Sequence, residues 1–171
     1  MKRLYTPWRS SYASAVQGTK DPNATAADCA FCSQLKENND AKNYILKRFK
    51  HSYVVLNKYP YNAGHLLVIP FEHKPQLHTL SLEARHELMD VLNQAIQAVQ
   101  SHLGAQGVNV GLNLGRAAGA GIPSHLHFHV LPRWDGDTNF LPTLANVKTI
   151  SFDLNEMYLK LKPFFANTPG E

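Results

Sequence analysis

The fold is decided by the stretch His125-Leu126-His127-Phe128-His129, which places three imidazoles at alternate positions of the chain. Side chains of a β-strand alternate between its two faces, so a strand here turns all three histidines to one face. Burying one imidazole costs a hydrogen bond or a charge, and a row of three multiplies that cost. Three ordinary core histidines are therefore a poor explanation. The row predicts a metal site, a catalytic site, or both.

The chemistry of imidazole favours a reaction at phosphorus. A large share of an ordinary histidine side chain is unprotonated at neutral pH, and the neutral ring is a good nucleophile. The loop Gly115–Gly121, just upstream of the row, contains only glycine, alanine and one arginine. Small residues let backbone N–H groups approach a phosphate closely, although such a loop alone is also typical of a simple turn.

The surrounding sequence predicts an α+β fold with a five-stranded antiparallel sheet. The expected strands are Asn43–Lys47, Ser52–Leu56, Gly64–Pro70, Gly107–Leu114 and His125–Leu131. After the third strand, apolar residues recur at steps of three and four, which predicts one long helix over Ser81–Leu103. Ser81 can cap its start and Gly104 can end it. A C-terminal helix is expected to begin near Leu154 and to stop at Pro163.

Composition indicates one globular domain that takes a small anionic substrate. The 171 residues are 44% hydrophobic and 18% charged, which is enough for a buried core. The expected organisation is an N-terminal arm over 1–28, a domain over 29–165 and a C-terminal tail over 166–171. Tyr5, Trp8 and Tyr12 are expected to anchor the arm. The net charge of +4 suits an anionic ligand but is too small to indicate nucleic acid binding.

Targeting signals are not apparent in the sequence. The N-terminus lacks the apolar segment of a signal peptide, and no apolar run reaches the roughly 20 residues that span a bilayer. We therefore expect a cytoplasmic protein that does not enter a membrane.

Several segments resemble the histidine triad (HIT) superfamily. Its signature is His-φ-His-φ-His-φ-φ, where φ is apolar, and His125–Leu131 match it at every position. Asn57–Pro70 resembles the first nucleotide-binding segment of the superfamily. The segments that resemble its diadenosine tetraphosphate phosphorylase branch are Tyr5–Arg9, Gly111–Gly115, Gly119–Ile122 and Pro132–Phe140. The resemblance implies a HIT-like fold and a homodimer that joins two sheets.

The resemblance also implies roles for five polar residues. His127 matches the nucleophile that attacks the α-phosphorus and becomes a nucleotidyl-histidine. His129 matches the position that hydrogen-bonds the phosphate. His65 matches the histidine on the neighbouring strand that borders the phosphate site. Asn57 matches a ribose-binding residue, although an ordinary turn residue is an equally good interpretation from the sequence alone. Asn113 matches a polar position near the phosphates and the leaving group.

Two further groups of residues are expected to bind substrate. Small hydrolases of the superfamily often carry Gln or Ser where this chain has Gly121 and Ile122. Without such a side chain near the leaving group, backbone N–H groups around Gly119 and Gly121 are expected to bind the phosphates instead. After the row, Arg133 offers a planar donor fork for an anion, and Trp134 can cover the site. A surface loop with an extended arginine is the other interpretation of that segment.

The two cysteines form a second motif, Cys29-Ala30-Phe31-Cys32. A C-x-x-C pair supplies half of a tetrahedral zinc site, and it is also compatible with a redox pair or with two inert thiols. The resemblance implies that His73, eight residues after His65, completes the site together with His125. We therefore expect one structural zinc ion and no organic cofactor.

Together these features predict an enzyme that cleaves dinucleoside polyphosphates, such as diadenosine tetraphosphate, through nucleotidyl-His127. Phosphate or water is the acceptor. Two alternatives stay open, namely a purine nucleoside phosphoramidate hydrolase with the same residues and a nucleotide-binding regulator with little turnover. The intact row argues against the regulator, because binding alone does not need the middle imidazole. The expected partner is a small nucleotide, and neither nucleic acid nor a membrane.

Overall fold

The computed structural model describes residues 21–145 and 152–167, which fall into two compact units. The larger unit is made of Asn39–Glu72, Ser81–Leu112 and the described residues from His127 onward. The smaller unit is made of the described residues up to Asn38, together with His73–Leu80 and Asn113–Leu126. Tyr5, Trp8 and Tyr12, the predicted anchors of the arm, lie outside the described residues.

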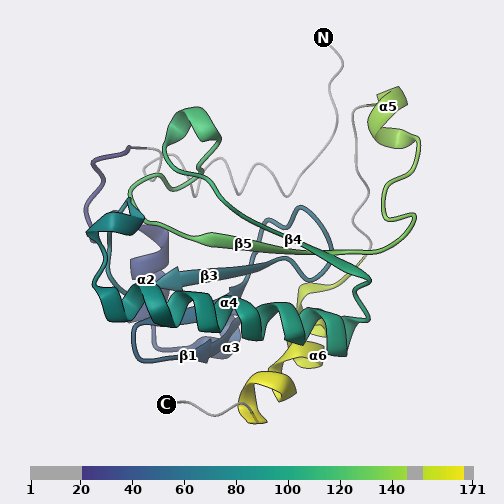
Figure 1. The fold of residues 1–171 in the computed structure, drawn as a ribbon, viewed down its shortest axis with the longest axis horizontal. Coiled ribbons are helices and arrows are strands. Elements are labelled where there is room, and N and C mark those ends of the chain that lie inside the picture. Colours follow the sequence, from purple (N-terminus) through teal and green to yellow (C-terminus); the bar gives the residue numbers. More distant parts are fainter. Residues whose placement is uncertain (1–20, 146–151, 168–171) are drawn as a thin grey trace. The chain divides into compact units, whose positions relative to one another are not determined.

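The larger unit contains a five-stranded antiparallel sheet, which confirms the predicted α+β class (Figure 1). Its strands are β1 (Ile45–Arg48), β2 (Ser52–Leu56), β3 (Leu66–Pro70), β4 (Gly107–Leu112) and β5 (Phe128–Arg133). Their order in the sheet is β1-β2-β3-β5-β4, and each neighbouring pair is antiparallel. The inner strands β2 and β3 are buried at every residue, whereas β4 is an edge strand and leaves Val110 44% exposed.

Helix α4 (Leu82–Leu103) packs against β2, β3 and β5. The hydroxyl oxygen of Ser81 accepts a hydrogen bond from the N–H of Ala84 at 3.2 Å, and Gly104 ends the helix with a φ of 63°. Both predicted ends are confirmed. The buried stripe of the helix consists of Ala84, Leu88, Val91, Leu92, Ala95, Ala98 and Val99.

Helix α6 (Leu154–Asn167) packs against α4 and β1 and continues through Pro163. The prediction that this proline ends the helix is wrong. The turn that follows buries Phe165, which is 1% exposed, and places Phe164 edge-on against His102 with 5.4 Å between the ring centroids. Burying these rings outweighs the hydrogen bond that a proline cannot donate.

The first predicted strand is displaced towards the C-terminus. Asp40–Asn43 form the short helix α3, and Tyr44 then takes a left-handed φ of 58°, so β1 begins at Ile45 instead of Asn43. Strands β3 and β4 are each two residues shorter than predicted. A short helix that the sequence did not indicate, α5, covers Leu141–Ala145.

Strand β5 differs from prediction at both ends. It begins at Phe128 rather than His125, because the N–H of Leu126 donates to the carbonyl of Lys74 at 2.8 Å instead of to a strand partner. It also runs past the expected stop at Pro132 to Arg133. Phe128–Val130 pair with both β3 and β4, and beyond Val130 the pairing continues with β4. The carbonyl of Pro132 accepts a hydrogen bond from the side-chain N–H of Asn62 at 2.9 Å.

The smaller unit holds the cysteine motif. Helix α2 (Ala30–Lys36) begins directly after Cys29, and two short 3₁₀ helices, η1 (Leu77–Thr79) and η2 (Arg116–Ala118), lie in the other segments of this unit. In the part of the chain that the structure describes, no helix combines the length and the apolar character needed to cross a bilayer.

Candidate active site

Strands β3 and β5 bring three histidines of the larger unit together. His65 directly precedes β3, and His127 and His129 lie at the start of β5. The two strands are antiparallel, and Leu66 is the register partner of Val130. His129 is the register partner of Leu67, two positions beyond His65, so the two histidines lie diagonally across the strand pair on the same face. We call His65, His127 and His129 the histidine cluster.

The imidazoles of the histidine cluster are in contact. Nε2 of His65 lies 2.9 Å from Nδ1 of His129, with 5.1 Å between the ring centroids. The ring of His127 meets that of His129 edge-on, at a centroid distance of 5.0 Å. His65 is fully buried and His127 is 5% exposed. The structure thus places the three predicted catalytic residues side by side, while their individual roles stay predictions.

Burial keeps two of these rings uncharged. Burial, and next the neighbouring His129 and His127, lower the pKa of His65 to about 3. Burial and His127 lower the pKa of His129 to about 4. Near pH 7 each ring therefore carries one hydrogen and one lone pair. A neutral imidazole can attack phosphorus or donate a hydrogen bond to a phosphate oxygen.

Sequence reasoning missed Tyr61, which lies over the histidine cluster. Its ring centroid is 4.8 Å from that of His65 and 5.6 Å from that of His129, and it is nearly parallel to the latter. The backbone N–H of Tyr61 donates to Nδ1 of His65 at 3.1 Å. Tyr61 lies four residues before His65, inside the segment that resembles a nucleotide-binding motif, but only the loop geometry gives it these contacts.

Asn57 reaches the same histidine. Its side-chain nitrogen lies 3.2 Å from Nδ1 of His65, and its side-chain oxygen accepts a hydrogen bond from the N–H of Tyr59 at 2.9 Å. The predicted ribose-binding residue is thus also a contact of the histidine cluster. Its role towards ribose stays a prediction.

Arg133 is held by an acidic residue that sequence reasoning did not single out. Its guanidinium donates to both carboxylate oxygens of Asp137, at 2.6 and 2.9 Å, and to the side chain of Asn109 at 2.8 Å. Asp137 also accepts from the side-chain N–H of Asn62 at 2.9 Å. The predicted anion fork of Arg133 therefore faces a carboxylate of its own chain, and its role in substrate binding stays a prediction.

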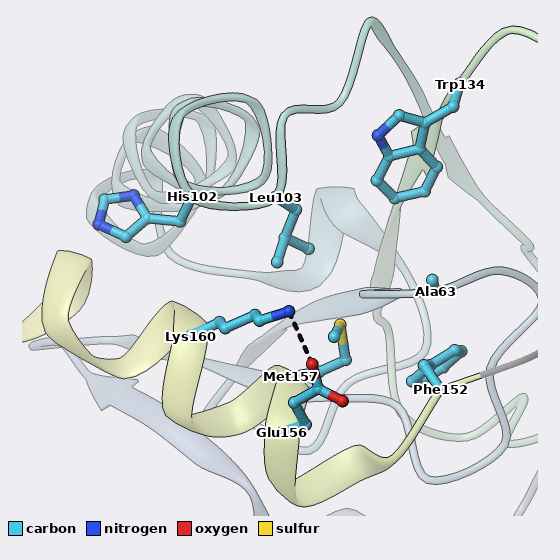
Figure 2. Close-up of a pocket in the computed structure, with 8 residues that line it drawn as sticks. All are labelled: Ala63, His102, Leu103, Trp134, Phe152, Glu156, Met157 and Lys160. Carbon is cyan, nitrogen blue, oxygen red and sulfur yellow. Dashed lines mark hydrogen bonds and ion pairs between the residues drawn. The ribbon is translucent and has the colours of Figure 1, made fainter.

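Trp134 lines a cavity of about 310 Å³ between the end of α4 and α6 (Figure 2). The other lining residues are Ala63, His102, Leu103, Phe152, Glu156, Met157 and Lys160. The indole N–H of Trp134 donates to the carbonyl of Gly104 at 3.0 Å, and Lys160 pairs with Glu156 at 2.7 Å. None of the described residues that line this cavity belongs to the histidine cluster. Trp134 as a cover of the active site stays a prediction.

The remaining predicted binding residues, Asn113, Gly119 and Gly121, belong to the smaller unit. In this loop the N–H of Gly119 donates to the carbonyl of Arg116 at 2.9 Å, closing the 3₁₀ turn η2. That donor is therefore used within the loop itself. The proposed approach of the loop to a phosphate stays a prediction.

The smaller unit brings together the four predicted metal ligands Cys29, Cys32, His73 and His125, which we call the metal cluster. Their ligand atoms all lie within 4.8 Å of one another. Nδ1 of His125 is 3.4 Å from Sγ of Cys29 and 3.6 Å from Sγ of Cys32, and Nδ1 of His73 is 3.5 Å from Sγ of Cys32. Tetrahedral zinc with ordinary bond lengths places sulfur and nitrogen ligands about 3.6 Å apart. The four residues therefore fit a zinc ion.

A further contact of the metal cluster agrees with that fit, and the pKa of one cysteine shows what a cation would change. The Nε2 atom of His73 lies 2.9 Å from the carbonyl of Ala24, so this nitrogen carries the hydrogen and Nδ1 keeps its lone pair for a metal. Burial, and next the Cys29 thiol, raise the pKa of Cys32 to about 12. A cation at this position would reverse that effect and hold the sulfur as a thiolate.

Comparison with known proteins places the chain in a family. The model of the HIT domain matches residues 38–136. An AP-4-A phosphorylase from Mycobacterium tuberculosis is 36% identical over 169 residues, which are 99% of this chain and 87% of that relative. An adenosine 5′-monophosphoramidase from Schizosaccharomyces pombe is 32% identical over 61% of this chain and 74% of its own length. A zinc-bound histidine triad family protein from Mycobacterium smegmatis has a similar fold, with a TM-score of 0.68 and 26% identity over 83% of this chain and 96% of that one.

The histidine row predicts histidines in contact on one strand of an antiparallel sheet. The structure has this arrangement, with His127 and His129 at the start of the inner strand β5. The chain belongs to the HIT domain family. The predicted family resemblance is thereby confirmed, as is the predicted fold.

Proposed function

We propose that this protein cleaves dinucleoside polyphosphates through a nucleotidyl-His127 intermediate. One observation carries the proposal, namely the contact among three imidazoles of the histidine cluster, two of them with strongly lowered pKa values. It is supported by the identity of 36% with an AP-4-A phosphorylase over nearly the whole chain. In this proposal His127, the middle residue of the row, is the nucleophile because it matches the nucleophile position of the HIT family.

The proposed reaction has two steps at one phosphorus atom. First, a ring nitrogen of His127 bonds to the α-phosphorus, while the bond from that phosphorus to the bridging oxygen breaks and the leaving polyphosphate keeps the electron pair. Diadenosine tetraphosphate then gives adenylyl-His127 and ATP. Second, phosphate or water attacks the same phosphorus and the nitrogen–phosphorus bond breaks, which gives ADP or AMP and the free imidazole. Hydrogen bonds from His129 would stabilise the charge that develops on the phosphoryl oxygens.

Substrate contacts are proposed for six further residues. The proposed set is Asn57 for the ribose, Asn113 and the backbone of Gly119 and Gly121 for the phosphates, and Arg133 and Trp134 for the acceptor side. In this scheme Arg133 meets the substrate together with its partner Asp137, so it acts as a positioned donor rather than as a free charge.

Product analysis tests the proposal. The purified protein is incubated with diadenosine tetraphosphate, with and without inorganic phosphate, and the nucleotides are separated by chromatography. Phosphorolysis gives ADP and ATP, and asymmetric hydrolysis gives AMP and ATP. A denaturing quench during turnover should trap adenylyl-protein in the wild type and none in His127→Asn. Absence of any cleavage would contradict the proposal.

The choice of acceptor is tested separately. Water is present at roughly 55 M, so a phosphorylase must exclude it and position phosphate in line behind the phosphorus–nitrogen bond. We propose that Trp134 contributes to this exclusion, and Trp134→Ala should then shift the products from ADP towards AMP. If phosphate leaves AMP as the sole cleaved mononucleotide in the wild type, the enzyme is a hydrolase.

A purine nucleoside phosphoramidate hydrolase is the second candidate. The likeness to an adenosine 5′-monophosphoramidase favours it, since the same histidines would cleave a P–N bond in a smaller substrate. Adenosine phosphoramidate supplied in parallel distinguishes the two activities by their kcat/KM values. A regulator that only binds nucleotides would turn over neither substrate.

We further propose that the metal cluster holds one structural zinc ion. The likeness to a zinc-bound histidine triad protein supports this, together with the ligand distances. The ion would tie α2 to the segment before β5 and keep His125 out of the chemistry. A reducing compartment such as the cytoplasm would preserve both cysteines as ligands.

The apolar edge strand β4, with Val110 partly exposed, would suit the proposed homodimer that joins two sheets.

A further inference from the structure

The loop before β3 fixes the hydrogen on one ring nitrogen of His65. The backbone N–H of Tyr61 points at Nδ1 of His65 with 3.1 Å between the two nitrogens. A backbone N–H can only donate, so Nδ1 of His65 must accept. That nitrogen therefore carries no hydrogen, and the single hydrogen of the neutral ring lies on Nε2.

Asn57 supplies a second and independent donor. Its side-chain oxygen accepts from the N–H of Tyr59 at 2.9 Å, and this contact identifies which end of the amide is the oxygen. The other end is then the amide nitrogen, which faces Nδ1 of His65 at 3.2 Å. Two donors of different origin thus converge on the same ring nitrogen.

The assignment passes from His65 to His129. Nε2 of His65 carries the hydrogen and lies 2.9 Å from Nδ1 of His129, so it donates to that nitrogen. Nδ1 of His129 is therefore an acceptor, and the hydrogen of a neutral His129 lies on its Nε2. The tautomers of both rings thus follow from the two donors that face Nδ1 of His65, the backbone N–H of Tyr61 and the amide of Asn57.

We propose that Asn57 and the backbone N–H of Tyr61 are positioning groups that fix the tautomers of His65 and His129, so that His129 presents Nε2–H as a hydrogen-bond donor. The ligand chemistry that this donor recognises is a phosphoryl oxygen. While Nε2 holds its hydrogen it cannot take a proton from an attacking water or phosphate, so His129 acts as a donor and not as a general base. This consequence for catalysis rests on the proposed function, but the tautomers do not.

The loop is held in place by contacts on its far side. The side-chain N–H of Asn62 donates to the carbonyl of Pro132 and to the carboxylate of Asp137, each at 2.9 Å. The N–H of His65 donates to the carbonyl of Asn62 at 3.3 Å. The ring of Tyr61 covers both imidazoles. The donor of Tyr61 therefore cannot turn away without breaking several other bonds.

Nuclear magnetic resonance of the ring nitrogens tests the tautomers directly. The whole protein is labelled with ¹⁵N-histidine, and long-range ¹H–¹⁵N correlations at pH 7 distinguish a protonated from an unprotonated ring nitrogen. The expected result is a hydrogen on Nε2 and none on Nδ1 in both His65 and His129, assigned by comparison with His65→Gln and His129→Gln. A hydrogen on Nδ1 of either residue in the wild type, or a cationic ring, would overturn the proposal.

A pair of variants tests the role of Asn57. In Asn57→Ala the N–H of Tyr61 remains and the tautomers should be unchanged. In Asn57→Asp a carboxylate replaces the amide donor, so Nδ1 of His65 should gain a hydrogen. A carboxylate can still accept a hydrogen bond from a ribose hydroxyl, so the ring-nitrogen spectra of the free protein are the readout that isolates the effect on the histidines. An unprotonated Nδ1 of His65 in Asn57→Asp would show that the N–H of Tyr61 alone fixes the tautomer, and it would overturn the role of Asn57.

Kinetics give a second readout of the same pair. We expect kcat of Asn57→Asp to lie about ten- to a hundredfold below that of Asn57→Ala, the range seen when outer partners of a functional histidine are changed. The comparison is made on kcat at saturating substrate, and the exposed substitution His86→Gln serves as the unperturbed control. Equal kcat values would overturn the catalytic consequence. If the protein cleaves no dinucleotide while the spectra match, the proposed function fails and the tautomer assignment stands.

Discussion

Gly64, the residue before His65, occupies a position where any side chain would be strained. Its φ is +67°, which is a left-handed conformation, and an added Cβ would collide with Cδ1 of Leu103 at the end of α4. The same Cβ would lie 3.4 Å from Cγ of Pro132. The backbone at this point therefore approaches its neighbours as closely as glycine alone permits.

The expected cost of Gly64→Ala has two parts. The left-handed conformation costs an alanine about 1–2 kcal/mol. The collision with Leu103 adds at most about 1 kcal/mol, the low end of an overpacking cost, because Cδ1 is the end of a flexible side chain that lines the cavity and can turn into it. Gly104→Ala is a matched control, since Gly104 has a φ of +63° and nothing within 4 Å of its added Cβ. The control should lose only the first part.

Urea denaturation followed by fluorescence measures both variants at equal protein concentration. We expect the free energy of unfolding of Gly64→Ala to fall by about 2–3 kcal/mol in total, against about 1–2 kcal/mol for Gly104→Ala. Combining Gly64→Ala with Leu103→Ala should cost less than the sum of the two single changes, because the double variant removes the collision. A Gly64→Ala protein as stable as Gly104→Ala would refute this reasoning.

The other expectations concern the two clusters. His127→Asn should lower turnover by several orders of magnitude with an unchanged melting temperature, and near-normal turnover would rule out the covalent mechanism. Metal analysis should find one zinc ion per chain in the wild type and less in Cys29→Ser, with a lower melting temperature; unchanged values for both would exclude the zinc site. The pKa values of His65 and His129 are lowered to about 3 and about 4 in the folded protein, whereas an unfolded histidine has a pKa near 6.5. The unfolded chain therefore binds more protons than the folded one below about pH 6.5, and the free energy of unfolding should fall as the pH falls from about 6 to about 4. The decline should be shallower in His129→Gln, and equal slopes would show that His129 is not responsible.

Features with a local physical cause were predicted well from the sequence. The long helix was predicted with both ends, because an N-cap serine and a left-handed glycine act through contacts within a few residues, as Ser81 and Gly104 do. The histidine cluster and the metal cluster were predicted from spacing together with a family resemblance. The resemblance was needed for His65 and His73, which the spacing of the row and of the cysteine pair does not indicate.

Features that depend on distant partners were predicted poorly. The start of β5 was placed at His125, because the sequence does not show that the N–H of Leu126 is taken by Lys74. The end of α6 was placed at Pro163, because the burial of Phe165 depends on tertiary packing. The contacts of Tyr61 were missed for the same reason, since a backbone N–H has no signature in the sequence.

The change of pairing along β5 gives its two halves different opening free energies. Phe128–Val130, beside the histidine cluster, are hydrogen-bonded into the middle of the sheet, whereas the segment that leads to Arg133 relies on β4 and on the amide of Asn62. The far half can therefore open as a small local unit without disturbing the imidazoles. Amide hydrogens there would exchange with solvent earlier than those beside His129.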